Sequence, residues 1–306
     1  MMRPMKKGAI SADVLLLVTA AIWGFAFTAQ RAGMDYIGPF LYSGIRFFLG
    51  ALVLVPVWAL RARKKAGGKI PRNEIISPKL FKTGVIAGIF LFLGVSFQQV
   101  GLLYTTAGKS GFITGLYVII IPVLGIFWKQ SSRVGTWIGA VFAVAGLYLL
   151  SFTGSFSIGR GDLLTLASAF FWALHVHAIG RFAGSVDTLQ LAIFQYFFCS
   201  VASFAVAGFS ETGSMQAVWN AALPLLYGGI CSVGIAYTLQ VVAQKSAPAS
   251  HAAIIMSLES VFAVLGGFLI LGETLSSRGL AGCALMFCGM IISQLSVGRR
   301  KAAARD

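Results

Sequence analysis

The sequence predicts an all-α integral membrane protein with ten transmembrane helices, arranged as two inverted five-helix repeats. Composition is the first reason, because hydrophobic residues make up 58% of the chain and charged residues only 11%, unlike a soluble domain. Apolar stretches are the second: they recur from end to end, each near the roughly 20 residues that cross a bilayer core. In lipid each must be helical, since a lone strand would leave its backbone groups unpaired. The third is an internal repeat.

The repeat divides the chain at about its midpoint. At one constant offset, Trp23 corresponds to Trp172 and Arg46 to Gln195. We therefore expect a first repeat over residues 1–152 and a second over residues 153–306. Five spans is an odd number, so the second repeat enters the bilayer from the opposite side. Inverted repeats of this kind are typical of secondary transporters, whose site lies between the two halves.

The predicted spans follow from the apolar stretches. The first repeat places them at residues 12–31, 39–60, 82–103, 109–128 and 134–152, and the second at 162–181, 188–208, 219–242, 248–271 and 278–297. The first span could be read as a signal peptide, with its basic start and apolar core. The matching segment of the second repeat is internal, however, so both are interpreted as membrane spans. Residues 61–80, rich in Gly, Lys and Arg, are predicted to form a cytoplasmic loop.

The net charge of +15 is explained by topology. With the N-terminus in the cytoplasm, the outer loops hold only Arg31, Lys109, Arg160 and Arg278 of the 24 Lys and Arg, and Arg46 lies within a helix. The remaining basic residues are cytoplasmic, as the positive-inside rule requires. We expect both termini in the cytoplasm, a bacterial inner (plasma) membrane as the location, and the lipid bilayer rather than nucleic acid as the partner. The oligomeric state stays open.

Neither a cofactor nor a metal is expected. The four cysteines, Cys199, Cys231, Cys283 and Cys288, lie inside apolar stretches without metal-ligand spacing, so they are interpreted as small buried hydrophobic residues. The sequence contains no glycine-rich phosphate loop and no His-Glu-x-x-His motif.

Several motifs occur in a characteristic order along the helices. They are Ala21-Ile22-Trp23-Gly24 with Arg31, Arg46-Phe47-Phe48, Pro122 in the fourth span, Leu258-Glu259-Ser260-Val261-Phe262, and Leu271-Gly272-Glu273-Thr274-Leu275. Together they resemble EamA-type members of the drug/metabolite transporter superfamily over essentially the full length. Ser260 stands where that family usually has proline, so no kink is predicted in the ninth span. The resemblance implies a central cavity lined by helices one, three, four, six, eight and nine, and export of amino-acid-like metabolites.

Glu259 is the acidic residue predicted to lie deepest in the membrane. A charge at this depth is costly and calls for a reason. It could bind a substrate amine or carry a proton; the alternative is a protonated residue that packs against neighbouring helices.

His175 is the second candidate for proton coupling. It lies three residues from Trp172 and so shares a helix face with it, whereas His177 is about 200° further round the helix than His175. We therefore expect His175 to line the cavity and His177 to face a neighbour or the interface. His251, at the start of the ninth span, is expected to be interfacial.

Aromatic and amide side chains complete the predicted substrate site. Trp23 and Trp172 are related by the repeat and are expected to face each other, where they either stack a substrate or fill the helix crossing. The remaining predicted lining residues are uncharged: Gln98, Tyr104, Tyr117, Tyr237 and Gln240. Such a set suits a zwitterionic or neutral metabolite. Arg46 is interpreted as a structural residue that bonds helix-end carbonyls.

These observations predict a secondary-active transporter of a small polar metabolite that works by alternating access. Because no ATP-binding motif occurs, the proton gradient or exchange would supply the energy, with Glu259 and His175 as proton-coupling residues. Two alternatives are an intramembrane serine protease, with Ser110 as nucleophile and His251 as base, and a passive channel, although no filter motif is evident. Ser110 corresponds to Ser250 in the second half, which favours a role in the repeat.

Overall fold

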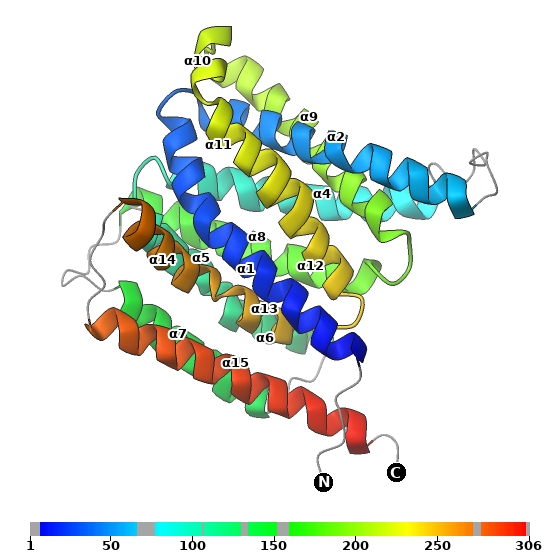
Figure 1. Ribbon diagram of the computed structural model, residues 1–306, viewed down its shortest axis with the longest axis vertical. Helices are drawn as coiled ribbons and strands as arrows, with labels where there is room; N and C mark the ends of the chain where they lie inside the picture. Colours follow the sequence, from blue (N-terminus) through cyan, green and yellow to red (C-terminus); the bar gives the residue numbers. More distant parts are fainter. Residues whose placement is uncertain are drawn as a thin grey trace.

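The computed structural model describes residues 7–65, 77–105, 107–129, 134–151, 159–271 and 277–303, and every regular element within them is helical (Figure 1). Six helices are long and apolar enough to cross a membrane: Ala12–Met34, Pro39–Lys64, Pro78–Gly101, Arg160–Phe182, Thr188–Ser210 and Ala222–Ala243. Four shorter apolar helices occupy Ile113–Phe127, Val134–Gly146, Ala249–Leu265 and Ser277–Ser293. The chain is therefore a multi-pass membrane protein, and its organisation as ten spans in two repeats stays a prediction.

The elements follow the predicted spans closely. The first half contains α1 (Lys7–Met34), α2 (Pro39–Lys65), α4 (Pro78–Gly101), α5 (Ala107–Gly115), α6 (Tyr117–Phe127) and α7 (Val134–Ser151). The second half contains α8 (Arg160–Phe182), α9 (Thr188–Ser210), α10 (Met215–Asn220), α11 (Ala222–Leu226), η1 (Tyr227–Tyr237), α12 (Thr238–Ala243), α13 (Ala249–Met256), α14 (Glu259–Leu271) and α15 (Ser277–Ala303). Part of the predicted loop at 61–80, and Glu273, lie outside the described residues.

Carboxylates and hydroxyls cap several helix starts. Ser77 accepts a hydrogen bond from the backbone of Leu80 at 3.1 Å, and Asp187 caps the first turn of α9 in the same way. The carboxylate of Glu211, distant in sequence, accepts from the amides of Phe40 and Leu41 at the start of α2, both at 2.8 Å. Such caps satisfy backbone donors that a helix leaves free, so Glu211 ties the end of α9 to the start of α2.

Two predicted spans are broken in the structure. The fourth is divided at Leu116 into α5 and α6, and the ninth at Ser257 and Leu258 into α13 and α14. Ser257 donates its hydroxyl to the carbonyl of Ile254 at 2.9 Å, a local bond that competes with the helix ladder and bends helices. The ninth helix is thus interrupted although Ser260 replaces the family's proline. Inside a bilayer such irregular backbone is tolerated only where protein buries it or a cavity borders it.

The eighth span changes its helical geometry along its length. It runs from α11 through the π-helix η1 into α12. A wider π turn is frequent at functional sites. Gly229 of η1 lets α2 approach closely, because a Cβ there would lie 2.7 Å from the Cβ of Leu49.

The helices form one bundle around α1. Figure 1 shows α1 crossing the middle of the molecule, with α11 and α12 on one side of it and α13 and α14 on the other. The helices α2 and α9 lie together at one edge, and α7 and α15 lie side by side at the opposite edge. The main apolar core includes Leu16 of α1, Leu91 of α4, Ile121 of α6, Ala173 of α8 and Ile254 of α13. Helices from both halves therefore share one core.

Candidate functional site

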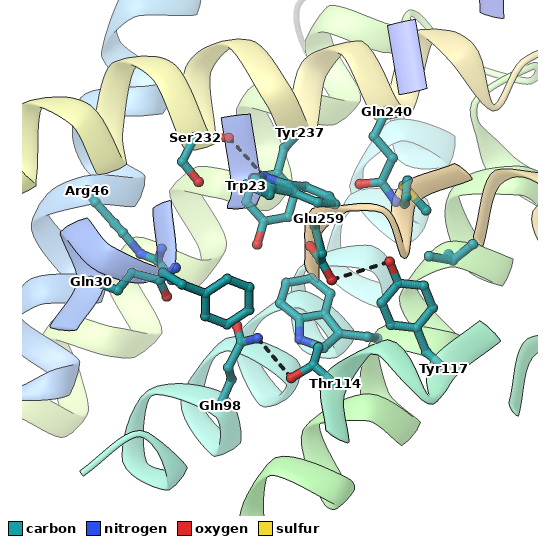
Figure 2. A pocket seen from close by; sticks show the side chains of 14 residues that line it. Trp23, Gln30, Arg46, Gln98, Thr114, Tyr117, Ser232, Tyr237, Gln240 and Glu259 are labelled. Carbon is teal, nitrogen blue, oxygen red and sulfur yellow. Dashed lines mark hydrogen bonds between the residues drawn. The ribbon is translucent and has the colours of Figure 1, made fainter. Parts of the chain in front are cut away.

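A cavity lies where the broken helices meet α1, α8 and η1 (Figure 2). Its open volume is about 30 Å³. The residues that line it belong to α1, α2, α4, α5, α6, α8, η1, α12, α13 and α14. They are, in chain order, Trp23, Phe27, Gln30, Arg46, Gln98, Thr114, Tyr117, Trp172, Val176, Ser232, Tyr237, Gln240, Met256 and Glu259. These are the predicted spans one, three, four, six, eight and nine that the resemblance implied, together with α2.

The two helix breaks bring Tyr117 and Glu259 together. Tyr117 is the first residue of α6 and Glu259 the first residue of α14. The Tyr117 hydroxyl donates to Oε1 of Glu259 at 3.4 Å, and both side chains are buried. Free backbone donors and the helix dipole at the start of α14 favour negative charge there. The carboxyl of Glu259 is therefore placed to accept a proton or a cationic group within the cavity.

An aromatic cluster forms another wall. The ring of Tyr237 lies 4.5 Å from that of Trp23 and 5.8 Å from that of Trp172, centroid to centroid. The two tryptophans are thus on the same cavity, but each packs against Tyr237. Trp23 donates its Nε1 hydrogen to the carbonyl of Ser232 at 3.4 Å, whereas Nε1 of Trp172 has no hydrogen-bond partner.

Amide side chains supply uncharged polar groups. Gln98 donates to the hydroxyl of Thr114 at 3.2 Å, and Gln240 donates to Oε1 of Gln244 at 3.1 Å. The amide of Gln30 donates to the carbonyl of Ala26 at 3.2 Å. The side-chain oxygens of Gln30 and Gln240 are buried and accept no hydrogen bond. The residues that line the cavity therefore include two acceptors that the protein leaves unpaired.

Arg46 contributes a guanidinium group from α2. The side chain is 1% exposed, and its Cζ lies 5.0 Å from the ring of Phe47 and 5.5 Å from that of Tyr42. Its Nε and Nη2 atoms have no hydrogen-bond partner. The expected bonds to helix-end carbonyls are therefore not made by these two nitrogens, and the residue belongs to the cavity wall.

Two of the predicted site residues lie elsewhere. Tyr104 follows the end of α4, is 54% exposed, and packs under the guanidinium of Arg160 at 5.1 Å. His175 is fully buried between α8 and α9, where its Nε2 lies 2.8 Å from Oε1 of Gln195. Neither side chain lines this cavity. The other predicted residues, Trp23, Gln98, Tyr117, Trp172, Tyr237, Gln240 and Glu259, all do.

The remaining histidines hold helices together. His251, expected at the interface, is buried: Nε2 lies 2.9 Å from Oδ1 of Asp13, and Nδ1 lies 3.1 Å from the hydroxyl of Ser293. It thereby links α13 to α1 and α15. His177 contacts the carbonyl of Ile121 at 2.8 Å, which joins α8 to α6.

Ser110 has none of the partners that a nucleophile requires. Its side chain is fully buried, and its hydroxyl makes no hydrogen bond. A serine nucleophile needs a base within hydrogen-bond reach, and His251 is bonded to Asp13 and Ser293 instead. Among the residues that the structure describes, no group of three or more His, Cys, Asp or Glu could hold a metal ion.

Several lining residues were not predicted, although helical spacing points to some of them. Phe27 and Gln30 lie four and seven positions after Trp23 and so share its face, and Val176 lies four positions after Trp172. Thr114 and Met256 stand beside the helix breaks, which the sequence did not reveal. Ser232 belongs to the π-helix, where ordinary helical spacing does not hold.

The family model of the EamA-like transporter family matches residues 10–152 and again residues 159–295. An uncharacterized transporter of Archaeoglobus fulgidus is 32% identical over 94% of this chain and 86% of its own length. The uncharacterized transporters YoaV and YvbV of Bacillus subtilis are 24% and 27% identical, and cover 94% and 95% of this chain and 97% and 94% of their own lengths.

A solved crystal structure has a similar fold. It matches with a TM-score of 0.77, covers 95% of this chain and 98% of its own, and is 21% identical in sequence. At that identity the likeness concerns the fold alone.

Proposed function

Since the chain belongs to the EamA-like transporter family, we propose that it is a secondary-active membrane transporter of a small polar metabolite that works by alternating access at the cavity around Glu259. In this proposal residues 1–152 and 153–306 form two inverted five-helix repeats, both termini are cytoplasmic, and the membrane is the bacterial inner membrane. Export of amino-acid-like compounds is the direction and substrate class that the resemblance favours.

The observation that carries the proposal is the bond between the two helix breaks. Tyr117 and Glu259 begin α6 and α14, which belong to the two proposed halves, and their side chains meet inside the cavity at 3.4 Å. Discontinuous helices at corresponding places in two halves are the best pointer to a transporter's binding site. A rearrangement of one half against the other would make or break this contact.

The small size of the cavity supports a mechanism in which the surrounding helices move. An open volume of about 30 Å³ holds roughly two water molecules, since each needs about 10–15 Å³ by this measure. A metabolite is larger, so it enters only when the surrounding helices separate. The broken backbones at Leu116 and at Ser257 and Leu258 are the natural places for the half-helices to turn.

Glu259 is assigned the chemical role in the cycle. As a carboxylate it binds a substrate ammonium group, and as a carboxylic acid it carries a proton in the return step. His175 does not reach the cavity but packs edge-on against Trp172, with ring centroids 5.8 Å apart. In this proposal His175 would therefore affect proton coupling only indirectly, by positioning the indole ring of Trp172.

Thermal unfolding of the purified protein tests binding without any assumption about direction. A ligand that binds only the folded state raises the melting temperature by mass action. We expect at least one L-amino acid or amine to stabilise the protein, because the carboxylate of Glu259 is placed to bind its ammonium group. The variant Glu259→Gln should lose most of this stabilisation and remain folded.

Flux in proteoliposomes then tests transport itself. A compound that stabilises the protein should cross faster than in protein-free liposomes, and Glu259→Gln should lower that flux at least about tenfold. Flux equal to the protein-free control for every stabilising compound would reject the transporter. Full flux in Glu259→Gln would remove that residue from the mechanism.

A further inference from the structure

The guanidinium of Arg46 is a buried cation that forms no ion pair with a carboxylate of the described residues. It is 1% exposed, and the aromatic rings of Tyr42 and Phe47 lie 5.5 and 5.0 Å from its Cζ. Nε and Nη2 donate to nothing. A charged side chain at membrane depth is costly, and such residues usually pair with each other or mark a substrate path.

The side chain is directed into the cavity. Figure 2 shows the guanidinium of Arg46 pointing from α2 towards Gln30 and the interior of the pocket. The side chain runs beside Gly228 of η1, where a Cβ would lie 3.5 Å from Cδ of Arg46 and 2.8 Å from the Tyr42 hydroxyl. Arg46 therefore lines the cavity with a guanidinium group whose Nε and Nη2 donors are buried and unpaired, so that a separation of the surrounding helices would free them for a ligand.

The cavity carries one group of each charge. Glu259 lines the same cavity as Arg46, yet the two side chains form no salt bridge, and Glu259 instead accepts from Tyr117 at 3.4 Å. In Figure 2 the aromatic group of Trp23 and Tyr237 lies between them in the view. A ligand with an anionic and a cationic end would neutralise both groups, whereas a dianion would leave excess negative charge beside Glu259.

We infer that Arg46 binds the carboxylate of the transported metabolite while Glu259 takes its ammonium group, so that the cavity recognises an amino acid by both ends. This rests on the proposed function, which it deepens by assigning the substrate's orientation. The planar guanidinium suits a carboxylate because its nitrogens donate two parallel hydrogen bonds. The unpaired side-chain oxygen of Gln240 is a further acceptor for the ammonium end (Figure 2).

The test compares matched ligands. Each common amino acid is compared with its carboxamide, in which a neutral amide replaces the carboxylate. Dissociation constants are measured from thermal stabilisation of the full-length protein, at a pH where both ammonium groups are protonated. We expect at least one amino acid to bind tenfold or more tightly than its carboxamide. In Arg46→Gln, which introduces the residue that the second half has at position 195, this ratio should fall close to one.

Controls separate binding from folding. Arg31→Gln removes a cation that is 51% exposed and only 3.8 Å from Asp35, so its ratio should equal that of the wild type. Arg46→Lys keeps the charge without the two-pronged geometry and should lower the ratio at least threefold. If Arg46→Gln does not fold, the ratio measured with Arg46→Lys tests the role of Arg46.

A second pair of ligands, an amino acid and its N-acetylated form, tests the role of Glu259. N-acetylation removes the ammonium charge, so the acetylated amino acid should bind at least tenfold more weakly to the wild type and show little difference in Glu259→Gln. Equal binding of amino acid and carboxamide to the wild type, or a preference that survives in both Arg46 variants, overturns the inference. Binding through Arg46 without flux in proteoliposomes would reject the transporter and leave the binding site in place.

Discussion

The hydroxyl of Tyr117 is the smallest group whose removal tests the contact between the two helix breaks. Tyr117→Phe deletes the 3.4 Å hydrogen bond to Glu259 and keeps the ring that packs in the core. A bond of this length lies at the weak end of the usual range, about 0.5–1 kcal/mol. We expect substrate affinity or flux to fall about two- to fivefold, measured in proteoliposomes.

A matched substitution controls for the loss of a phenol. Tyr104→Phe makes the same chemical change at a side chain that is 54% exposed and outside the cavity, so flux should stay at the wild-type value. Equal losses in the two variants would contradict a specific role for Tyr117.

Depth and spacing indicate the position of some side chains. Glu259 was singled out because a polar group deep in an apolar span needs a reason, and it lines the cavity together with Tyr117. His175 was placed on the face of Trp172 correctly, but Gln195 of α9 bonds its ring and keeps it from the cavity. Spacing along one helix does not say which neighbour covers a face. Arg46 is the opposite case. It belongs to a span that was expected to lie outside the cavity, yet its side chain passes beside Gly228 and lines the cavity.

At the scale of helices, the crossing of α7 and α15 depends on two glycines. A Cβ on Gly139 would lie 2.7 Å from the carbonyl oxygen of Gly289, and backbone cannot move aside as a side chain can. Gly139→Ala should therefore destabilise the protein by about 1–3 kcal/mol, the usual cost of overpacking. A lower melting temperature in detergent would show this.

Gly208 of α9 provides the matched control. A Cβ there meets nothing within 4 Å, so Gly208→Ala gains helix propensity without a clash and should leave the melting temperature unchanged or raise it slightly. A melting temperature for Gly139→Ala at or above that of Gly208→Ala would contradict the close crossing.

The positions of the helices were predictable, but their interruptions were not. Long apolar stretches must be helical in lipid, and α2, α8 and α9 begin within a few residues of the predicted starts. At the break before Glu259, the hydroxyl of Ser257 donates to the carbonyl of Ile254 at 2.9 Å. Serine makes such bonds in many unbroken helices, so its presence alone does not predict an interruption.

Across the whole molecule, the proposed repeat symmetry fails at one informative position. Arg46 and its counterpart Gln195 lie on α2 and α9, but Arg46 lines the cavity while Gln195 bonds His175. The basic group of the cavity therefore comes from the first half alone, and Glu259 of the second half supplies the acidic group. A cavity with one positive and one negative end suits an oriented zwitterion better than a symmetric ligand.

Charge distribution predicts the orientation of the molecule, and labelling of intact cells tests it. In a variant without native cysteines, we expect Arg31→Cys to react with a membrane-impermeant maleimide, since Arg31 belongs to the sparse basic residues of the outer loops. Arg181→Cys and Lys245→Cys should react only after the cells are opened. All three native side chains are exposed, so reactivity reports the side of the membrane rather than burial. The reverse labelling pattern would mean that the termini and the basic loops face outward. It would contradict the orientation predicted from the Lys and Arg residues of the loops next to the spans.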